Sequence, residues 1–137
     1  MIKVFLDTNI LMDFIESRPG AVDAANVLRY ANAGTIYLAA SILTFANMAY
    51  IIGRKRSQQE VCQVLGQLRK VVNIVALEPL HVNKAIDLPC KDFEDMLQYQ
   101  CAVNNQFNII VTNNKKDFVE FSKLPLFTAA ELINELK

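Results

Sequence analysis

The chain has 137 residues, of which 53% are hydrophobic, and its 14 basic and 14 acidic residues cancel to a net charge of zero. This length and apolar content predict one folded domain over residues 1–137, and they exclude a disordered chain or one that needs disulfides to fold. The zero net charge counts against a protein that coats long nucleic acid through charge alone. It does not exclude a nuclease whose acids gather in one site.

The cysteines and the N-terminus bear on the compartment. Three cysteines are an odd number and show no CxxC spacing, so we expect them to be reduced. The first apolar run meets a charge at Asp7, too early for a signal peptide or a membrane span. The sequence therefore predicts a cytoplasmic protein without a membrane segment.

Short apolar runs alternate with helical patterns along the chain. The first strand is predicted at residues 2–6, and helical spacing follows at 8–17. Pro19 suits the start of a second helix, and Gly34 suits its end. Further strands are predicted at 35–39, 71–77, 108–112 and around Phe127, and further helices at 41–52, 57–70, 79–86, 92–106 and 128–137, with a turn or short helix at 113–118.

This alternation predicts an α/β fold. Strands that alternate with helices pair in parallel through right-handed crossovers. The strands are short apolar runs, as expected when helices cover both faces of the sheet. Ligands of such open sheets bind beyond the carboxyl ends of the strands, so the residues that follow each strand are the candidates for chemistry.

Carboxylates stand at these positions. Asp7 ends the first strand, and Asp117 follows the fourth strand. Asp92 and Asp95 lie three residues apart, on one face of the helix that precedes the fourth strand. Carboxylates held together repel each other, and a divalent cation relieves the repulsion. Mg²⁺ and Mn²⁺ prefer oxygen ligands, and a metal-bound water can attack a phosphodiester, so the pattern predicts a metal-dependent hydrolytic site.

Each acid also has a purely structural explanation. Asp7 can cap the first helix, and Asp92 and Glu94 fit the acidic first turn of a helix. Asp117 can be a solvated turn residue. The metal interpretation is favoured because all of these explanations would otherwise have to coincide at one edge of one sheet.

Three segments resemble the PIN-domain family: residues 4–9 (VFLDTN), 92–98 (DFEDMLQ) and 110–118 (IVTNNKKDF). Their order and spacing match the family over nearly the whole chain. The resemblance implies a three-layer α/β/α sandwich with a mostly parallel sheet of four to five strands. It also implies a metal-dependent ribonuclease, commonly the toxin of a type II toxin–antitoxin module.

The resemblance also implies which residues act. By motif position, Asp7, Asp95 and Asp117 are the catalytic acids and would hold one or two Mg²⁺ or Mn²⁺ ions. The supporting polar residues would be Thr8, Asn9, Thr112 and Asn114, with Asp92 as an added acid at the rim.

One position departs from the family pattern. Many PIN domains present a glutamate to the metal from the helix after the second strand, and this chain has Asn47 there. An amide oxygen can ligate a metal without adding charge, and Asn47 can equally be a polar residue that bonds to a neighbour. Two functions therefore stay open: an endoribonuclease that hydrolyses RNA, and a weakened PIN domain that binds RNA or protein. A phosphatase ranks last, because Asn9 replaces the second aspartate of such enzymes.

Partners are predicted as well. Helix 41–52 is apolar nearly all round, which indicates that it is either wholly buried or shared with a neighbour. Together with helix 57–70 it is expected to form a homodimer contact, a groove for an antitoxin, or both. The basic run Arg54, Lys55 and Arg56 can contact the RNA backbone or simply be a solvated helix end.

Overall fold

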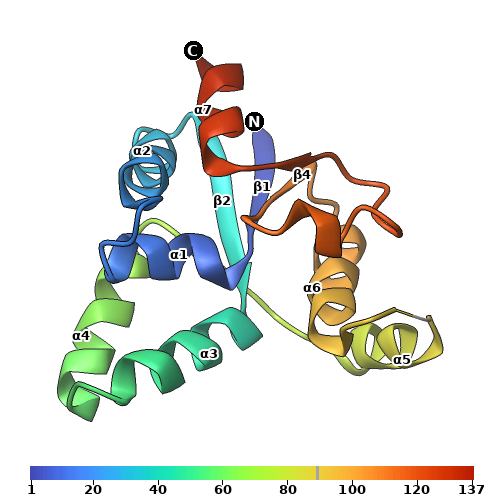
Figure 1. Ribbon diagram of the computed structural model, residues 1–137, viewed down its shortest axis with the longest axis horizontal. Helices are drawn as coiled ribbons and strands as arrows, with labels where there is room; N and C mark the ends of the chain where they lie inside the picture. The colour runs from blue at the N-terminus through green and yellow to red at the C-terminus, as the bar shows by residue number, and fades with distance from the viewer. Residues whose placement is uncertain (89) are drawn as a thin grey trace.

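The computed structural model describes residues 1–88 and 90–137. Within them, five parallel strands form one sheet in the order β3-β2-β1-β4-β5 (Figure 1). The central strand β1 pairs with β2 on one side and with β4 on the other. The strands are β1 (Ile2–Leu6), β2 (Ile36–Ser41), β3 (Asn73–Val75), β4 (Ile109–Val111) and β5 (Leu126–Phe127).

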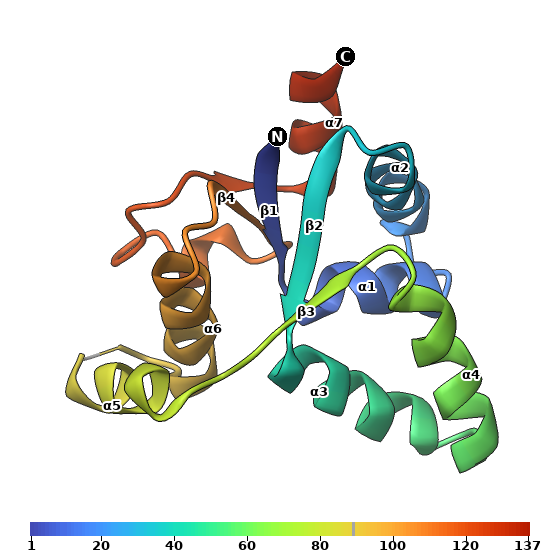
Figure 2. The same cartoon turned by 180° about the vertical axis from the view of Figure 1, so that it is seen from behind.

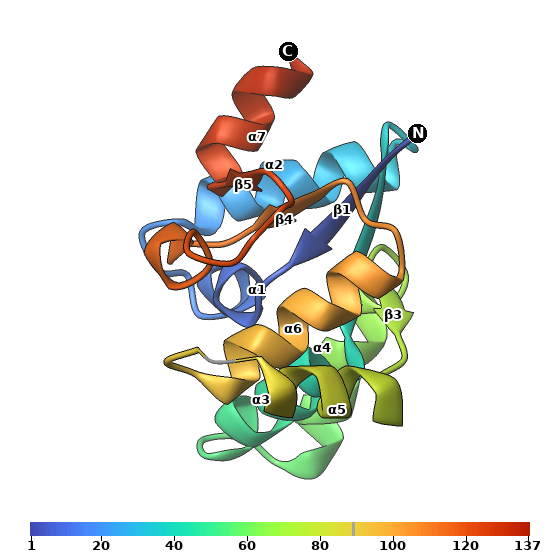
Figure 3. The same ribbon diagram turned by 90° about the vertical axis from the view of Figure 1, so that its right-hand side faces the viewer.

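Helices cover both faces of the sheet, so the predicted three layers are confirmed (Figures 1 and 2). One layer contains α1 (Thr8–Ile15), α2 (Ala21–Asn32), α3 (Ile42–Gly53), α4 (Gln58–Leu68) and α7 (Ala129–Leu136). The other contains α5 (Pro79–Asp87) and α6 (Phe93–Asn104), which lie side by side in front of the sheet in Figure 3. A short 3₁₀ helix, η1 (Lys115–Asp117), follows β4.

Strand β1 is buried on both faces because its side chains alternate between two cores. Val4 and Leu6 pack with α1 to α4 and α7, whereas Phe5 packs with α5 and α6. Each of these side chains contributes about 1.5–3 kcal/mol when fully buried. This burial on both sides fixes the position of the residue that comes next, Asp7.

Several predicted boundaries are wrong, for local reasons. The second helix begins at Ala21 rather than Pro19, and it ends at Asn32, two residues before Gly34. The third strand is paired only over Asn73–Val75. Its predicted first residues, Val71 and Val72, instead donate to the Leu68 carbonyl at the end of α4. Its predicted last residues lie beyond Ser41, where β2 stops and the Ser41 hydroxyl caps α3.

Helix α3 is not wholly buried, so that alternative was wrong. Thr44, Met48 and Ile52 face the core, but Ile42 is 49% exposed and Tyr50 is 68% exposed. In the described part of the chain, no helix is both long and apolar enough to cross a membrane.

Candidate metal centre

Asp7 lies at the carboxyl edge of the sheet, between its two central strands. Leu6 of β1 is in register with Val111 of β4, so the residues that follow, Asp7 and Thr112, are neighbours. The Asp7 main-chain N–H donates to the Val111 carbonyl at 3.0 Å. The polar residues predicted from two distant segments of the sequence therefore meet at this edge.

The Asp7 carboxylate accepts three hydrogen bonds. Thr8 N–H donates to Oδ1 at 2.8 Å, as expected for the cap of α1. The Thr112 hydroxyl and the Asn9 amide donate to Oδ2 at 2.8 and 3.2 Å. Burial nevertheless raises the pKa of Asp7, and the charge of Asp117 raises it further, while the three donors lower it in part. Asp7 is thus a helix cap and also a half-buried acid whose charged form depends on its donors.

Asp92 and Asp95 lie in the first turn of α6. The Asp92 carboxylate caps the helix by accepting from the Asp95 N–H at 3.0 Å. Partial burial, followed by the charges of Asp92, Asp7, Asp117 and Glu94 in that order, raises the pKa of Asp95 to about 7. Four acids, two from the same helical turn and two from other segments, therefore act electrostatically on the Asp95 carboxyl group.

A cleft of about 640 Å³ opens over Asp92, Asp95 and Asp117, and Asp7 is not among its lining residues. Asp117 reaches it from η1, whose turn is closed by the hydrogen bond from Asp117 N–H to the Asn114 carbonyl at 2.9 Å. The cleft also contains two exposed lysines, so it offers cations beside its acids. Its lining residues are Cys90, Lys91, Asp92, Asp95, Lys116, Asp117, Glu120 and Phe121.

The predicted supporting residues differ in how they contribute. Thr112 is fully buried, and besides donating to Asp7 it accepts from the Asn114 N–H at 3.0 Å. Asn114 thus acts through its main chain. The Thr8 hydroxyl lies 2.9 Å from the Thr44 hydroxyl, which also accepts from the Gln98 amide at 2.9 Å.

The sequence reasoning missed that last network. Gln98 is a buried polar residue on α6, and its amide oxygen accepts from the Ser41 hydroxyl at 2.7 Å. The network joins α3, α6 and the start of α1 behind the acids. A glutamine within the buried run Met96–Ala102 was the available signal.

Asn47 lies against the acidic first turn of α6. Its amide donates to Glu94 Oε1 at 2.8 Å, so the side chain that replaces an expected glutamate is bonded to a glutamate from the facing helix. Glu94 itself was interpreted from the sequence only as a first-turn acid. The contact is between residues 47 positions apart and has no local sequence signal.

The acids do not converge as closely as predicted. Among residues 1–88 and 90–137, no three His, Cys, Asp or Glu side chains lie close enough together to hold an ion directly. The chemistry of the donors still fits a hard divalent cation, because all of them are oxygen ligands. Burial, and after it the repulsion from the neighbouring acids, raises the pKa of Asp95 to about 7. A cation would remove that repulsion.

Two further surfaces lie apart from the acidic cleft. Arg54, Lys55 and Arg56 are exposed at the end of α3 and border a separate cleft of about 250 Å³ that also includes Arg18. An apolar groove of about 730 Å³ runs between α1, α2 and α4. Its apolar lining consists of Phe14, Ile15, Ala25, Leu28, Val64, Leu68 and Val71, with Arg29 and Arg56 among its polar residues.

Comparisons with known proteins agree with this architecture. A family model for the PIN domain matches residues 3–116. Ribonuclease VapC1 of Aquifex aeolicus (strain VF5) is 30% identical over 122 residues, with 82% of each chain covered.

Solved structures share the fold, among them a toxin–antitoxin complex from Klebsiella pneumoniae, which matches with a TM-score of 0.66 at 20% identity, covering 92% of this chain and 97% of that one. VapBC2 from Rickettsia felis, bound to a DNA fragment from their promoter, matches with a TM-score of 0.72 at 20% identity, covering 93% of this chain and 98% of that one. VapBC-1 from nontypeable Haemophilus influenzae gives a TM-score of 0.71 at 18% identity, covering 94% and 99%.

Proposed function

Because this chain belongs to the PIN-domain family, we propose that it is a Mg²⁺- or Mn²⁺-dependent endoribonuclease that works in the cytoplasm as the toxin of a toxin–antitoxin pair. The observation that carries the proposal is the placement of the acids: Asp7 is held by Thr112 at the carboxyl edge of the sheet, and Asp92, Asp95 and Asp117 line one cleft. Asp7 and Asp117 both lie near enough to Asp95 for their charges to act on it. The similarity to a protein named as a ribonuclease supports RNA as the substrate.

In this proposal Asp7, Asp95 and Asp117 would hold the ion, in part through its bound waters, and the ion would supply an activated water and steady charge on the phosphate. The chain's own residues prepare that site. Thr112 and Asn9 keep Asp7 oriented and favour its charged form. Lys91 and Lys116 line the same cleft, where they can bind phosphates on either side of the bond to be cut. Hydrolysis would leave a 3′-hydroxyl and a 5′-phosphate.

A second function is favoured by one contact. Asn47 brings no charge and is already bonded to Glu94, so the site holds one acid fewer on α3 than the family pattern. A site with less charge binds metal more weakly. The domain would then hold RNA or a protein partner without cutting.

A cognate antitoxin is the proposed protein partner. One of the solved structures that share the fold is a toxin–antitoxin complex, which supports such a partner. The groove between α1, α2 and α4 is lined by apolar side chains, which suits the apolar face of a partner helix. A homodimer contact through the exposed residues of α3, Ile42 and Tyr50, is proposed as well.

The decisive experiment separates cutting from binding. Purified protein should cleave a mixed RNA pool with Mg²⁺ or Mn²⁺ and stop when EDTA is added. Asp7→Asn should abolish cleavage while RNA retention on a filter persists. Cleavage that survives EDTA would contradict the metal mechanism, and retention without any cleavage by the wild type would favour the binding module.

A further inference from the structure

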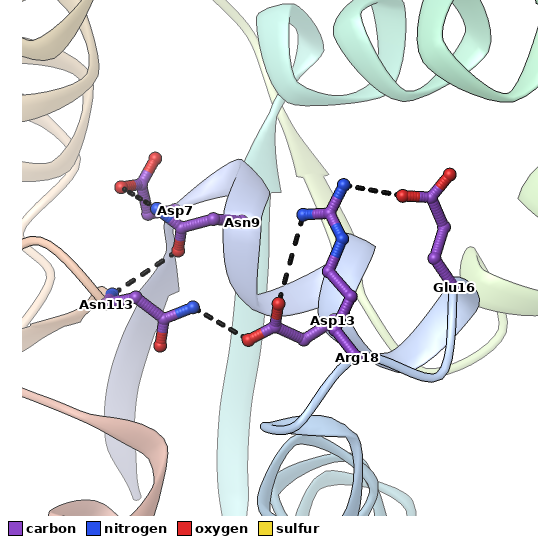
Figure 4. Close-up of polar contacts among 6 residues, drawn as sticks. All are labelled: Asp7, Asn9, Asp13, Glu16, Arg18 and Asn113. Carbon is purple, nitrogen blue, oxygen red and sulfur yellow. Dashed lines mark hydrogen bonds and ion pairs between the residues drawn. The ribbon is translucent and has the colours of Figure 1, made fainter.

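Asp13 is a buried carboxylate for which the proposed mechanism has no role. It lies in the second half of α1, six positions after Asp7, in an otherwise apolar run, and only 9% of it is exposed. Figure 4 shows its carboxylate between two groups. Asn113 Nδ2 donates to one oxygen at 2.7 Å, and Arg18 Nη1 lies 3.9 Å from the other.

These contacts do not explain the residue as a source of stability. The Arg18 pair is long, and the Arg18 side chain is 43% exposed and also bonded to Glu16. A buried carboxylate so sparsely paired costs desolvation, and an apolar residue of similar size is often as stable or more so. The short hydrogen bond to Asn113 is therefore the contact through which Asp13 can act on the rest of the molecule.

Asn113 leads from Asp13 to the metal centre. Its main-chain N–H donates to Asn9 Oδ1 at 3.3 Å. Because an N–H can only donate, the Asn9 oxygen must face Asn113, which turns the Asn9 amide nitrogen toward Asp7 Oδ2 at 3.2 Å. Figure 4 shows these hydrogen bonds as a chain that runs from Asp13 through Asn113 and Asn9 to Asp7.

Gly20 leaves room for the Asp13 carboxylate. A Cβ at this position would lie 2.6 Å from Asp13 Oδ2, the same oxygen that accepts from Asn113. The Gly20 backbone has φ −83°, which any residue can adopt, so the need for glycine is steric rather than conformational. Gly20→Ala should therefore displace the Asp13 carboxylate by steric contact while residue 13 itself stays an aspartate.

We propose that Asp13 is a positioning residue for the metal centre: through Asn113 it fixes the turn after β4 and the orientation of the Asn9 amide that donates to Asp7. The proposal rests on the metal site proposed above. It assigns no direct contact with metal or RNA to Asp13. Loss of this support should weaken metal binding through misorientation of Asp7, by about tenfold, as is usual for residues that support ligands.

The test uses two readouts on the full chain. One is the Mn²⁺ dissociation constant, from titration calorimetry. The other is the NMR signal of the Asn9 side-chain amide in the metal-free protein, which reports its orientation independently of metal and activity. Asp13→Leu and Gly20→Ala should both shift the Asn9 signal and weaken Mn²⁺ binding. Asp13→Asn keeps an acceptor oxygen and should stay close to wild type. Glu135→Leu, on the exposed side of α7, controls for the loss of one negative charge.

An exchange of the pair guards against a variant that fails to fold. Asn113→Asp alone places two carboxylates in contact and should disturb both readouts, whereas Asn113→Asp combined with Asp13→Asn restores an amide–carboxylate bond and should recover them. An unchanged Asn9 signal in Asp13→Leu and Gly20→Ala, or no recovery in the exchanged pair, would overturn the proposal. Failure of the wild type to bind Mn²⁺ would instead remove the proposed function, and the Asn9 signal would still decide whether Asp13 orients that amide.

Discussion

Replacing Thr112 with valine removes one hydroxyl from the centre of the site and keeps the branched shape of the side chain. Thr112 is fully buried, and its hydroxyl donates to Asp7 Oδ2 at 2.8 Å. The Thr112 hydroxyl oxygen also accepts from the Asn114 N–H. Asn114 is exposed, so water can take the place of the hydroxyl as acceptor for that N–H. The main cost of the substitution therefore falls on the Asp7 carboxylate.

The size of this cost should depend on pH. A hydrogen bond to a charged group contributes about 1.5–3 kcal/mol, and one to a neutral group about 0.5–1.5 kcal/mol. The Thr112 bond favours charged Asp7, so it lowers the folded-state pKa, and its full contribution is present above that pKa. As the pH falls through the pKa of Asp7, which burial has raised, the contribution should shrink to the neutral value. For a chain of this length the larger loss corresponds to a melting temperature lower by roughly 5–12 °C.

Thermal unfolding of both proteins in EDTA, at about pH 8 and about pH 3, measures the effect on either side of this titration, because the lower value lies below even the ordinary pKa of an aspartate. Thr44→Val is a matched control. Its hydroxyl is equally buried, but its partners Gln98 and Thr8 are neutral, so its loss should be the same at both values. Equal losses for Thr112→Val at the two pH values would refute a charged Asp7 that depends on this donor.

Four further outcomes are expected. Asp7→Asn should abolish RNA cleavage and, because it removes a half-buried charge whose pKa is raised, leave the metal-free protein at least as stable in thermal unfolding. The raised pKa of Asp95 means that metal-free wild type loses stability as the pH rises from about 4 to about 7, and Asp95→Asn should flatten that profile. Asn47→Asp faces Glu94 and should lower the melting temperature in EDTA, with recovery in Mg²⁺ only if both acids reach the metal. Leu28→Arg should block antitoxin binding in a pull-down without changing cleavage.

The strands and helices were predictable because local patterns carry them. Strand β1 was located over its whole length from one apolar run, and Ser41, Asp92 and Thr128 cap helices as their sequence positions predicted. The third strand was predicted too long because an edge strand is paired only where β2 lies beside it. The sequence shows the apolar run, whereas the length of the neighbouring strand β2 determines how much of that run is paired as a strand.

The contacts behind the site could not be predicted. The bond between Asp13 and Asn113 spans 100 positions, and that between Asn47 and Glu94 spans 47. Periodicity places a residue on a face of a helix but does not choose its rotamer or its partner across the sheet. An acid inside the apolar run of α1 was visible in the sequence, yet only the packed turn after β4 shows what it holds.

The strand order has a consequence for the time at which the protein can become active. Asp7 is made among the first residues, but its Thr112 donor and the pairing strand β4 come 105 positions later. The central strand of the sheet must therefore wait for its second neighbour until most of the chain has been synthesised, and closing so long a loop slows folding. Until then the acids of the cleft are not assembled. Under the proposed function, a growing chain has no assembled cleavage site during synthesis. The residues that line the apolar groove between α1, α2 and α4 have all been made once residue 71 has emerged, so we expect the proposed antitoxin to find its docking surface before the site is formed.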